Sequence, residues 1–155
     1  MSDVLVDLRV MEAVQMSLGA ERDAARERLA EIWPSLDSSD AFHRCIVAHY
    51  MADLQTDASA ELEWDRLALE AALSGSHDAF NGRIPGVEYA AFLPSLHLNL
   101  AASHERVGDL GAAKRQAAVA LHAIGVLGST PLDELTRAAV QRLCERLNLN
   151  PSTSA

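Results

Sequence analysis

The sequence predicts an all-α protein built as an α-solenoid, in which about three antiparallel helical hairpins stack and a C-terminal helix caps the last of them. Three observations predict this fold. Alanine and leucine, both strong helix formers, occur 27 and 22 times among 155 residues, whereas aromatic residues make up 5%. Glycine, proline and N-capping residues divide the chain into segments of helical length. Several segments carry two apolar stripes, which predicts that neighbours cover them on both sides.

The first half of the chain contains four predicted helices, each bounded by a residue that begins or ends a helix. Gly19 ends the first, because glycine readily adopts the backbone conformation that follows a helix. Pro34 ends the second, since proline lacks the amide hydrogen that a longer helix needs. The run 37–40, Asp-Ser-Ser-Asp, offers N-capping side chains to the third, and Asp57 precedes the fourth. The four helices are predicted at residues 3–18, 21–33, 41–55 and 58–73.

The second half opens with the one long loop that the sequence predicts, residues 75–87, which is rich in glycine and proline. In the helix that follows, Pro94 predicts either a kink or a helix start. Gly108 and Asp109 then predict a helix end and a new N-cap, and Thr130 precedes a proline at the first position of the last helix. The helices are predicted at residues 88–107, 110–124 and 131–147, within a single domain 1–150 and before a disordered tail 151–155.

The two apolar stripes are clearest in the predicted helix 58–73. Trp64 belongs to one stripe, with Ala60, Leu67 and Ala71, and Leu62, Leu69 and Leu73 form the other. At about 100° per residue the two stripes lie on nearly opposite sides of the helix. We therefore expect Trp64 in the core, with its neighbours Asp65 and Arg66 pointing outward.

The segment from Leu100 to Leu121 resembles a tetratricopeptide repeat. The resemblance rests on Leu100-Ala101, on the turn Gly108-Asp109 and on the small residues Ala113, Ala117 and Ala120, although His104 stands where the repeat has an aromatic residue. Weaker matches occur around Ala25 and Ala60, whose separation of 35 residues is close to the repeat period of about 34. The segments 49–55 and 93–100 also resemble a bacterial group of short repeat-containing proteins. The resemblance implies the solenoid fold and a module that binds other proteins.

The charge of the chain limits the class of partner. Its formal net charge is −9, which argues against nucleic acids and anionic membrane surfaces, because both attract basic patches. Seven acidic residues and one base lie between Asp53 and Asp78, which indicates either a solvated face or a docking surface for a basic partner. No apolar run has the length of a signal peptide or a membrane-spanning helix, and the two cysteines predict buried free thiols. These features predict a cytoplasmic protein.

Five residues are candidates for binding a partner or ligand. In tetratricopeptide-repeat proteins the first helix of each pair lines a concave groove, and the resemblance implies that Phe42, His49, Asp53 and Arg106 line it here. His49 and Asp53 are four residues apart and share one helix face, so they are also able to hold a polar ligand or two positions of a metal. Asn99 resembles the groove asparagine that holds a peptide carboxylate in some of these proteins, but the accompanying lysines are missing because Lys114 is the only lysine.

The sequence favours a binding module over an enzyme. It has no phosphate-binding loop, dinucleotide fingerprint, metalloprotease motif or nucleophile elbow, so no catalytic residue, metal or cofactor is predicted. Cys45 and His49, four residues apart, form a reactive pair only if the thiol is accessible. The expected function is binding of a peptide or protein with basic character. The alternatives are a small-molecule or metal sensor, or an enzyme, with a pocket between the helices 41–55 and 88–107, and a homodimeric scaffold.

Overall fold

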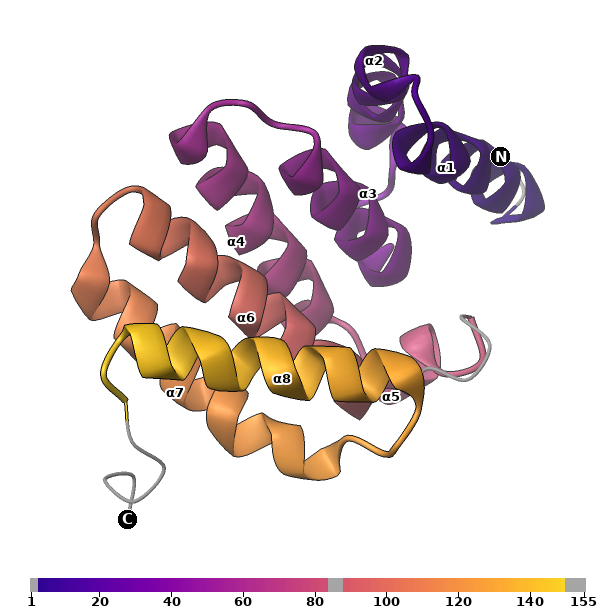
Figure 1. Ribbon diagram of the computed structural model, residues 1–155. Coiled ribbons are helices and arrows are strands. Elements are labelled where there is room, and N and C mark those ends of the chain that lie inside the picture. The colour runs from indigo at the N-terminus through magenta and orange to yellow at the C-terminus, as the bar shows by residue number, and fades with distance from the viewer. Residues whose placement is uncertain (1–2, 84–87, 150–155) are drawn as a thin grey trace. The chain divides into compact units, whose positions relative to one another are not determined.

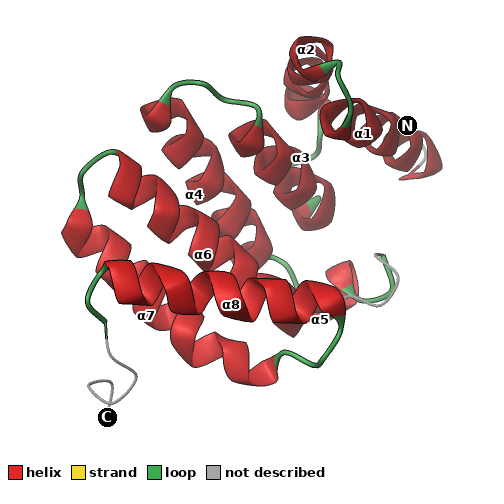
Figure 2. Cartoon of the chain, in the orientation of Figure 1, coloured by secondary structure: helices red, strands yellow, loops and turns green. Residues whose placement is uncertain are grey.

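The computed structural model describes residues 3–83 and 88–149, and these residues form helices joined by short connections, with no strand among them (Figure 2). The prediction of an all-α protein is therefore confirmed. The chain divides into two compact units, Met1–Gly75 and Ser76–Ala155, and the boundary falls at the start of the predicted loop 75–87. Each unit has its own buried side chains.

The first unit contains two helix pairs. It is made of α1 (Asp3–Leu18), α2 (Arg22–Ile32) with the 3₁₀ turn Trp33–Ser35, α3 (Ala41–Asp53) and α4 (Ala58–Ser74). α1 packs against both α2 and α3, and α3 and α4 form an antiparallel hairpin, side by side in Figure 1. Its core draws apolar side chains from all four helices, among them Val10, Ala13, Leu29, Val47, Ala48 and Ala68.

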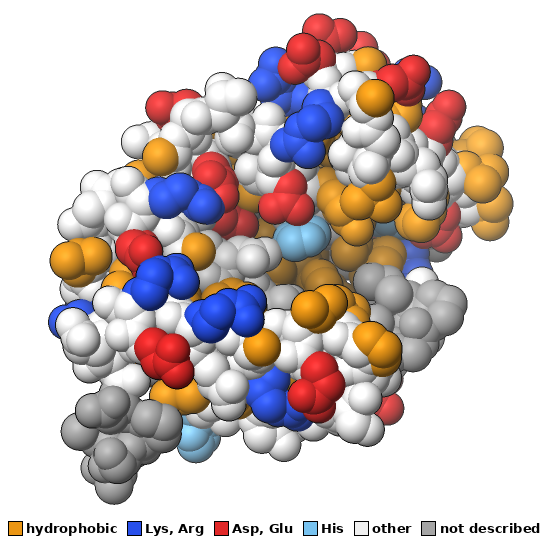
Figure 3. Space-filling model, in the orientation of Figure 1, with side chains coloured by type: hydrophobic (Ala, Val, Ile, Leu, Met, Phe, Trp, Pro, Cys, Tyr) orange, Lys and Arg blue, Asp and Glu red, His pale blue; other side chains and the backbone are white. Residues whose placement is uncertain are grey.

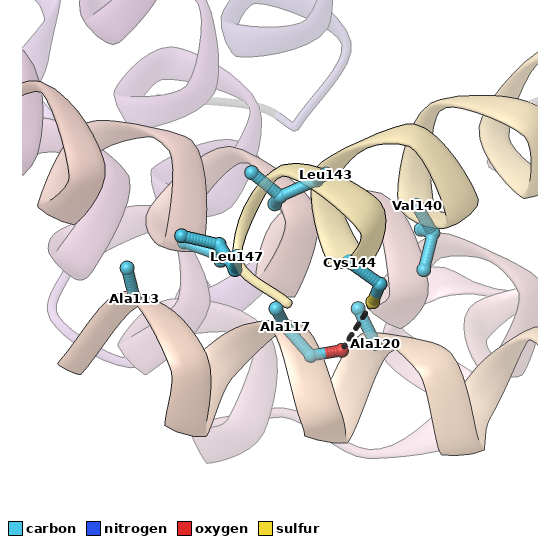
Figure 4. Close-up of a cluster of buried hydrophobic side chains, with 8 residues drawn as sticks. Ala113, Ala117, Ala120, Val140, Leu143, Cys144 and Leu147 are labelled. Carbon is cyan, nitrogen blue, oxygen red and sulfur yellow. Dashed lines mark hydrogen bonds between the residues drawn. The ribbon is translucent and has the colours of Figure 1, made fainter. Parts of the chain in front are cut away.

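The second unit is a hairpin of α6 (Tyr89–Arg106) and α7 (Leu110–Ala123), preceded by the short α5 (His77–Phe80) and followed by the 3₁₀ turn Ile124–Val126 and α8 (Pro131–Arg146). α8 packs against both α6 and α7 (Figure 1). Alanines of α7 face larger side chains of α8, and the small residues allow the helix backbones to approach closely (Figure 4). The cluster consists of Ala101, Ala113, Ala117, Ala120, Val140, Leu143, Cys144 and Leu147.

Residues that the sequence predicts at helix ends cap or terminate helices in the structure. The side chains of Asp40, Asp57 and Asp109 accept hydrogen bonds from the backbone amides of His43, Ala60 and Ala112. Thr130 and Asp133 form a reciprocal capping box at the start of α8. Gly108 has a φ of 86°, and the amides of Gly108 and Asp109 donate to the carbonyls of Glu105 and His104. This pair of bonds is a Schellman motif, so Gly108 ends α6 as predicted.

Two local features differ from expectation. The predicted loop 75–87 contains α5, which Ser76 caps, and residues 84–87 lie outside the described residues, as does the predicted tail 151–155. Asp65 was expected to point outward, but only 3% of its surface is exposed. That expectation was wrong because the buried part of the α4 surface is wider than the part that its two apolar stripes occupy. Trp64 itself is half-buried, with its ring edge-on to Trp33 at 5.1 Å between centroids.

Pro94 lies inside α6 rather than at its start, and it is buried. A proline within a helix removes one backbone hydrogen bond. In the part of the chain that the structure describes, no helix combines the length and the hydropathy that crossing a membrane requires.

Candidate functional site

His49 and Asp53 lie together near the C-terminal end of α3. The Nε2 atom of His49 is 4.0 Å from Oδ2 of Asp53, and the Asp53 side chain is mostly exposed whereas that of His49 is largely covered. The spacing of four residues predicts this approach, because side chains at i and i+4 occupy the same helix face. The carboxylate is thus the part of the pair that an external ligand can reach.

The burial of His49 sets the charge of this pair. Desolvation lowers the pKa of His49 from its ordinary value of 6.5, and the nearby negative charge of Asp53 only partly opposes this. Near neutral pH the imidazole is therefore uncharged and does not neutralise the carboxylate of Asp53. The pair presents a net negative charge, together with an imidazole that both donates and accepts hydrogen bonds.

Tyr50 completes this cluster, and the sequence analysis did not identify it. Its ring lies edge-on to the ring of His49, with 5.0 Å between centroids. Burial and then the charge of Asp53 raise the pKa of the Tyr50 hydroxyl. An aromatic side chain beside an acid is a frequent environment for a cationic group, and this combination is a signal that sequence reasoning could have used. We call His49, Tyr50 and Asp53 the α3 cluster.

Two arginines of α2 hold the end of the helix that carries the α3 cluster. Nη2 of Arg22 donates to the backbone carbonyl of Asp53 at 2.6 Å, and Nη1 of Arg26 donates to that of Leu54 at 3.5 Å. The last carbonyls of a helix have no partner within it, and a cation there also interacts favourably with the helix dipole. The position of Asp53 thus depends on α2 as well as on α3.

The other residues singled out on α3 are buried. Phe42 is in the core of the first unit, next to the ring of His43. Cys45 is fully buried, and desolvation raises the pKa of its thiol to about 12. A thiol with this pKa is protonated at neutral pH, so the geometry does not support a reactive pair with His49.

Asn99 and Arg106 belong to α6 of the second unit. Asn99 is half-buried, and Arg106 is exposed with Nη2 3.5 Å from Oγ of Ser103. In the same helix, Nδ1 of His97 lies 2.8 Å from Oε1 of Gln116, so His97 links α6 to α7. The proposed pocket between α3 and α6 would join residues of the two units, and it stays a prediction.

A buried histidine that the sequence analysis overlooked links α1 to α3. His43 is 2% exposed, and its ring nitrogens lie 2.6 Å from Oδ1 of Asp7 and 2.7 Å from Oδ2 of Asp40. The spacing of Asp40 and His43, an N-cap and a residue three positions later, was a signal for half of this arrangement. Asp7 is 36 residues from His43 in the sequence, and no local pattern indicates that contact.

The acidic segment 53–78 is partly neutralised within α4. Arg66 donates to Glu63 at 2.6 Å and to Glu70 at 2.7 Å. Arg66, the one base of the segment 53–78, therefore pairs with two of the acids of that segment, and a third acid, Asp65, is buried. The exposed negative charge of the segment is thus smaller than the sequence suggests. Asp53 takes no part in the ion pairs of Arg66, and its side chain is mostly exposed.

The described residues contain no group of three or more histidine, cysteine or acidic side chains placed to hold one metal ion. The α3 cluster provides two such groups, His49 and Asp53, at 4.0 Å from each other. The arrangement is suited to hydrogen bonding and to attraction of a cation rather than to closed metal coordination. No protein-family model, curated protein or solved structure matches this chain.

Proposed function

We propose that this chain is a tetratricopeptide-like module that binds a basic peptide or protein segment through the α3 cluster. The observation that carries the proposal is the exposed carboxylate of Asp53 next to an imidazole that burial keeps neutral and next to the ring of Tyr50. A lysine or arginine of the partner would meet the exposed carboxylate of Asp53 and the neighbouring aromatic ring of Tyr50.

The helix pairs of both units support the tetratricopeptide-like part of the proposal. In the first unit α1 contacts α2 and α3, as consecutive first helices do in such repeats, and α3 pairs with α4. In the second unit Gly108 turns α6 into α7, and alanines of α7 pack beneath α8. In a right-handed solenoid of such pairs, α1 and α3 would line the groove of the first unit.

Binding of a basic peptide to the full chain tests the proposal. A fluorescently labelled decapeptide rich in lysine and arginine is titrated with the wild type and with Asp53→Asn, and fluorescence anisotropy is measured. We expect the variant to bind about two- to fivefold more weakly, as loss of an exposed ion pair worth about 0.5–1 kcal/mol predicts. Binding should also weaken as salt is added, because salt screens exposed charges.

Glu27→Gln is the matched control, since Glu27 is an exposed acid of α2 in the same unit. Removing one negative charge there changes the net charge of the chain as much as Asp53→Asn does. If both variants weaken binding equally, attraction by the overall charge explains the result and the α3 cluster does not. Unchanged binding by a double His49→Ala and Asp53→Ala variant would also contradict the proposal.

A further inference from the structure

α1 carries an apolar face that no described part of the chain covers. Its inner side is buried, with Val10, Ala13 and Val14 in the core of the first unit. On the other side, five apolar residues are between 52% and 69% exposed. We call them the α1 outer stripe: Val4, Leu5, Leu8, Met11 and Leu18. Figure 3 shows hydrophobic side chains on the surface at the right-hand edge of the view, over α1 as Figure 1 places it.

The spacing of this stripe is that of a helix that pairs with another helix. Val4, Leu8, Met11 and Leu18 follow steps of four, three and seven residues, and Gln15 occupies the intermediate position. At 3.6 residues per turn these five positions fall within roughly 80° of arc, and Leu5 extends the apolar surface to roughly 140°. Alternating steps of three and four residues produce the seam of a two-helix contact, in which one polar residue is a frequent feature.

The apolar area of the stripe does not make a full interface by itself. Burying one aliphatic side chain removes roughly 60–120 Å² of apolar surface from water, so five offer at most roughly 300–600 Å². A stable interface takes about 800 Å² from each partner, so the stripe would form its apolar centre and flanking polar residues its rim. An apolar patch of this size on a monomer often marks an interaction site.

We propose that the α1 outer stripe is the interface of a homodimer, in which α1 packs against α1 of a second copy. A two-fold interface uses the same surface on both partners, and a straight apolar seam on one helix meets that requirement. The charge distribution fits this occupant. The whole chain carries a net charge of −9, yet Glu12 is the one charged residue among the exposed positions that the structure describes in α1. Two copies therefore meet where their mutual repulsion is smallest.

This inference does not rest on peptide binding by the α3 cluster, and salt separates the two. Salt screens the repulsion between two acidic copies, so it should strengthen dimerisation, whereas it should weaken the binding of a basic peptide.

Light scattering coupled to size-exclusion chromatography tests the dimer. The full chain is measured over a range of protein concentrations and at two salt concentrations. We expect the molar mass to rise from one chain towards two as the concentration increases, and to do so at lower concentration when salt is added. Leu8→Glu should be monomeric throughout, because the substitution places a carboxylate in each half of the seam. Leu8→Gln, which adds no charge, should also weaken dimerisation.

Leu132→Glu is the matched control. Leu132 of α8 is 61% exposed and Leu8 is 62% exposed, so both substitutions replace an equally accessible leucine. The control should dimerise like the wild type, and circular dichroism should give all variants the same helix content. A wild type that stays monomeric at every concentration and salt would overturn the proposal, as would a dimer that survives Leu8→Glu. A monomer that binds phosphatidylcholine vesicles through Leu8 would assign the stripe to a lipid surface instead.

Discussion

The Nε2 atom of His43 lies 2.6 Å from Oδ1 of Asp7, and this contact joins the first helix of the chain to the third. The other ring nitrogen of His43 lies 2.7 Å from Oδ2 of Asp40, the N-cap of α3. Both ring nitrogens of the buried imidazole are thus held by carboxylates, one from α1 and one from the N-cap of α3.

His43→Gln should destabilise the first unit. A glutamine is able to keep part of the hydrogen bonding, but it does not reach both carboxylates as the imidazole does, so at least one of them loses its partner on this side chain. We expect the free energy of unfolding in urea to fall by about 1–3 kcal/mol. His122→Gln is the control, because His122 of α7 is exposed and should tolerate the change. Equal stability of the two variants would mean that the Asp7–His43–Asp40 contacts contribute nothing.

Gly108→Ala should destabilise the turn between α6 and α7. The φ of Gly108 is 86°, a conformation that costs an alanine about 1–2 kcal/mol, while an added Cβ would meet no atom within 4 Å. The loss would therefore come from the backbone alone. Gly125→Ala is the comparison, since its Cβ also meets no atom within 4 Å and its φ is not positive. Measured by thermal denaturation, the Tm of Gly108→Ala should be lower than that of the wild type, and the Tm of Gly125→Ala should be unchanged. A lower Tm for Gly125→Ala than for Gly108→Ala would refute this role of Gly108.

The pKa of His49 predicts part of the pH dependence of stability. Folding lowers this pKa from 6.5, so below pH 6.5 the unfolded chain binds more protons at His49 than the folded chain does. The contribution of His49 to the free energy of unfolding is therefore fully present above pH 6.5 and decreases as the pH falls below it. Urea unfolding of the wild type and of His49→Gln between pH 8 and pH 5 measures this. The difference between them should change only in the acidic part of the range, and a constant difference would disprove the shift.

The thiol of Cys45 should be unreactive in the folded protein. It is fully buried and its pKa is raised to about 12, and burial also raises the pKa of Cys144. In a Cys144→Ser variant, Cys45 is the one remaining thiol. In the folded variant at pH 8, we expect Ellman's reagent to modify the thiol of Cys45 no faster than the protein unfolds. In concentrated urea, where the protein is unfolded, the modification should be immediate. Rapid modification of the folded variant would restore the hypothesis of an activated thiol beside His49.

Sequence periodicity and capping residues were sufficient to place the long helices. Each residue that caps or ends a helix does so through backbone groups within one turn of its own position, so its signal is local. These residues are Asp40, Asp57, Asp109, Thr130 and Gly108. α5 escaped prediction because four residues show no period. It is stabilised by contacts at a distance instead: the ring of Phe80 lies 5.1 Å from that of Tyr89, and the side chain of Asn81 accepts from the Tyr89 amide.

Some features of the candidate site also follow from local sequence, whereas others depend on how the helices pack. The proximity of His49 and Asp53 follows from helix geometry and could be predicted. The burial of Phe42, the buried position of Asp65 and the contact between Asp7 and His43 depend on which helices pack around each residue. Tyr50 lies between these cases: its position beside an acid on one helix face is a local signal, whereas its ring contact with His49 is seen only in the structure.

The most direct measurement of the proposed function is a nuclear magnetic resonance titration of the isotopically labelled chain with the lysine- and arginine-rich decapeptide. The chemical shifts of the backbone amides report where the peptide binds. We expect the largest changes at His49, Tyr50 and Asp53 of α3, while α8 stays unchanged. Changes confined to α8, or an unperturbed α3 at saturating peptide, would contradict binding by the α3 cluster.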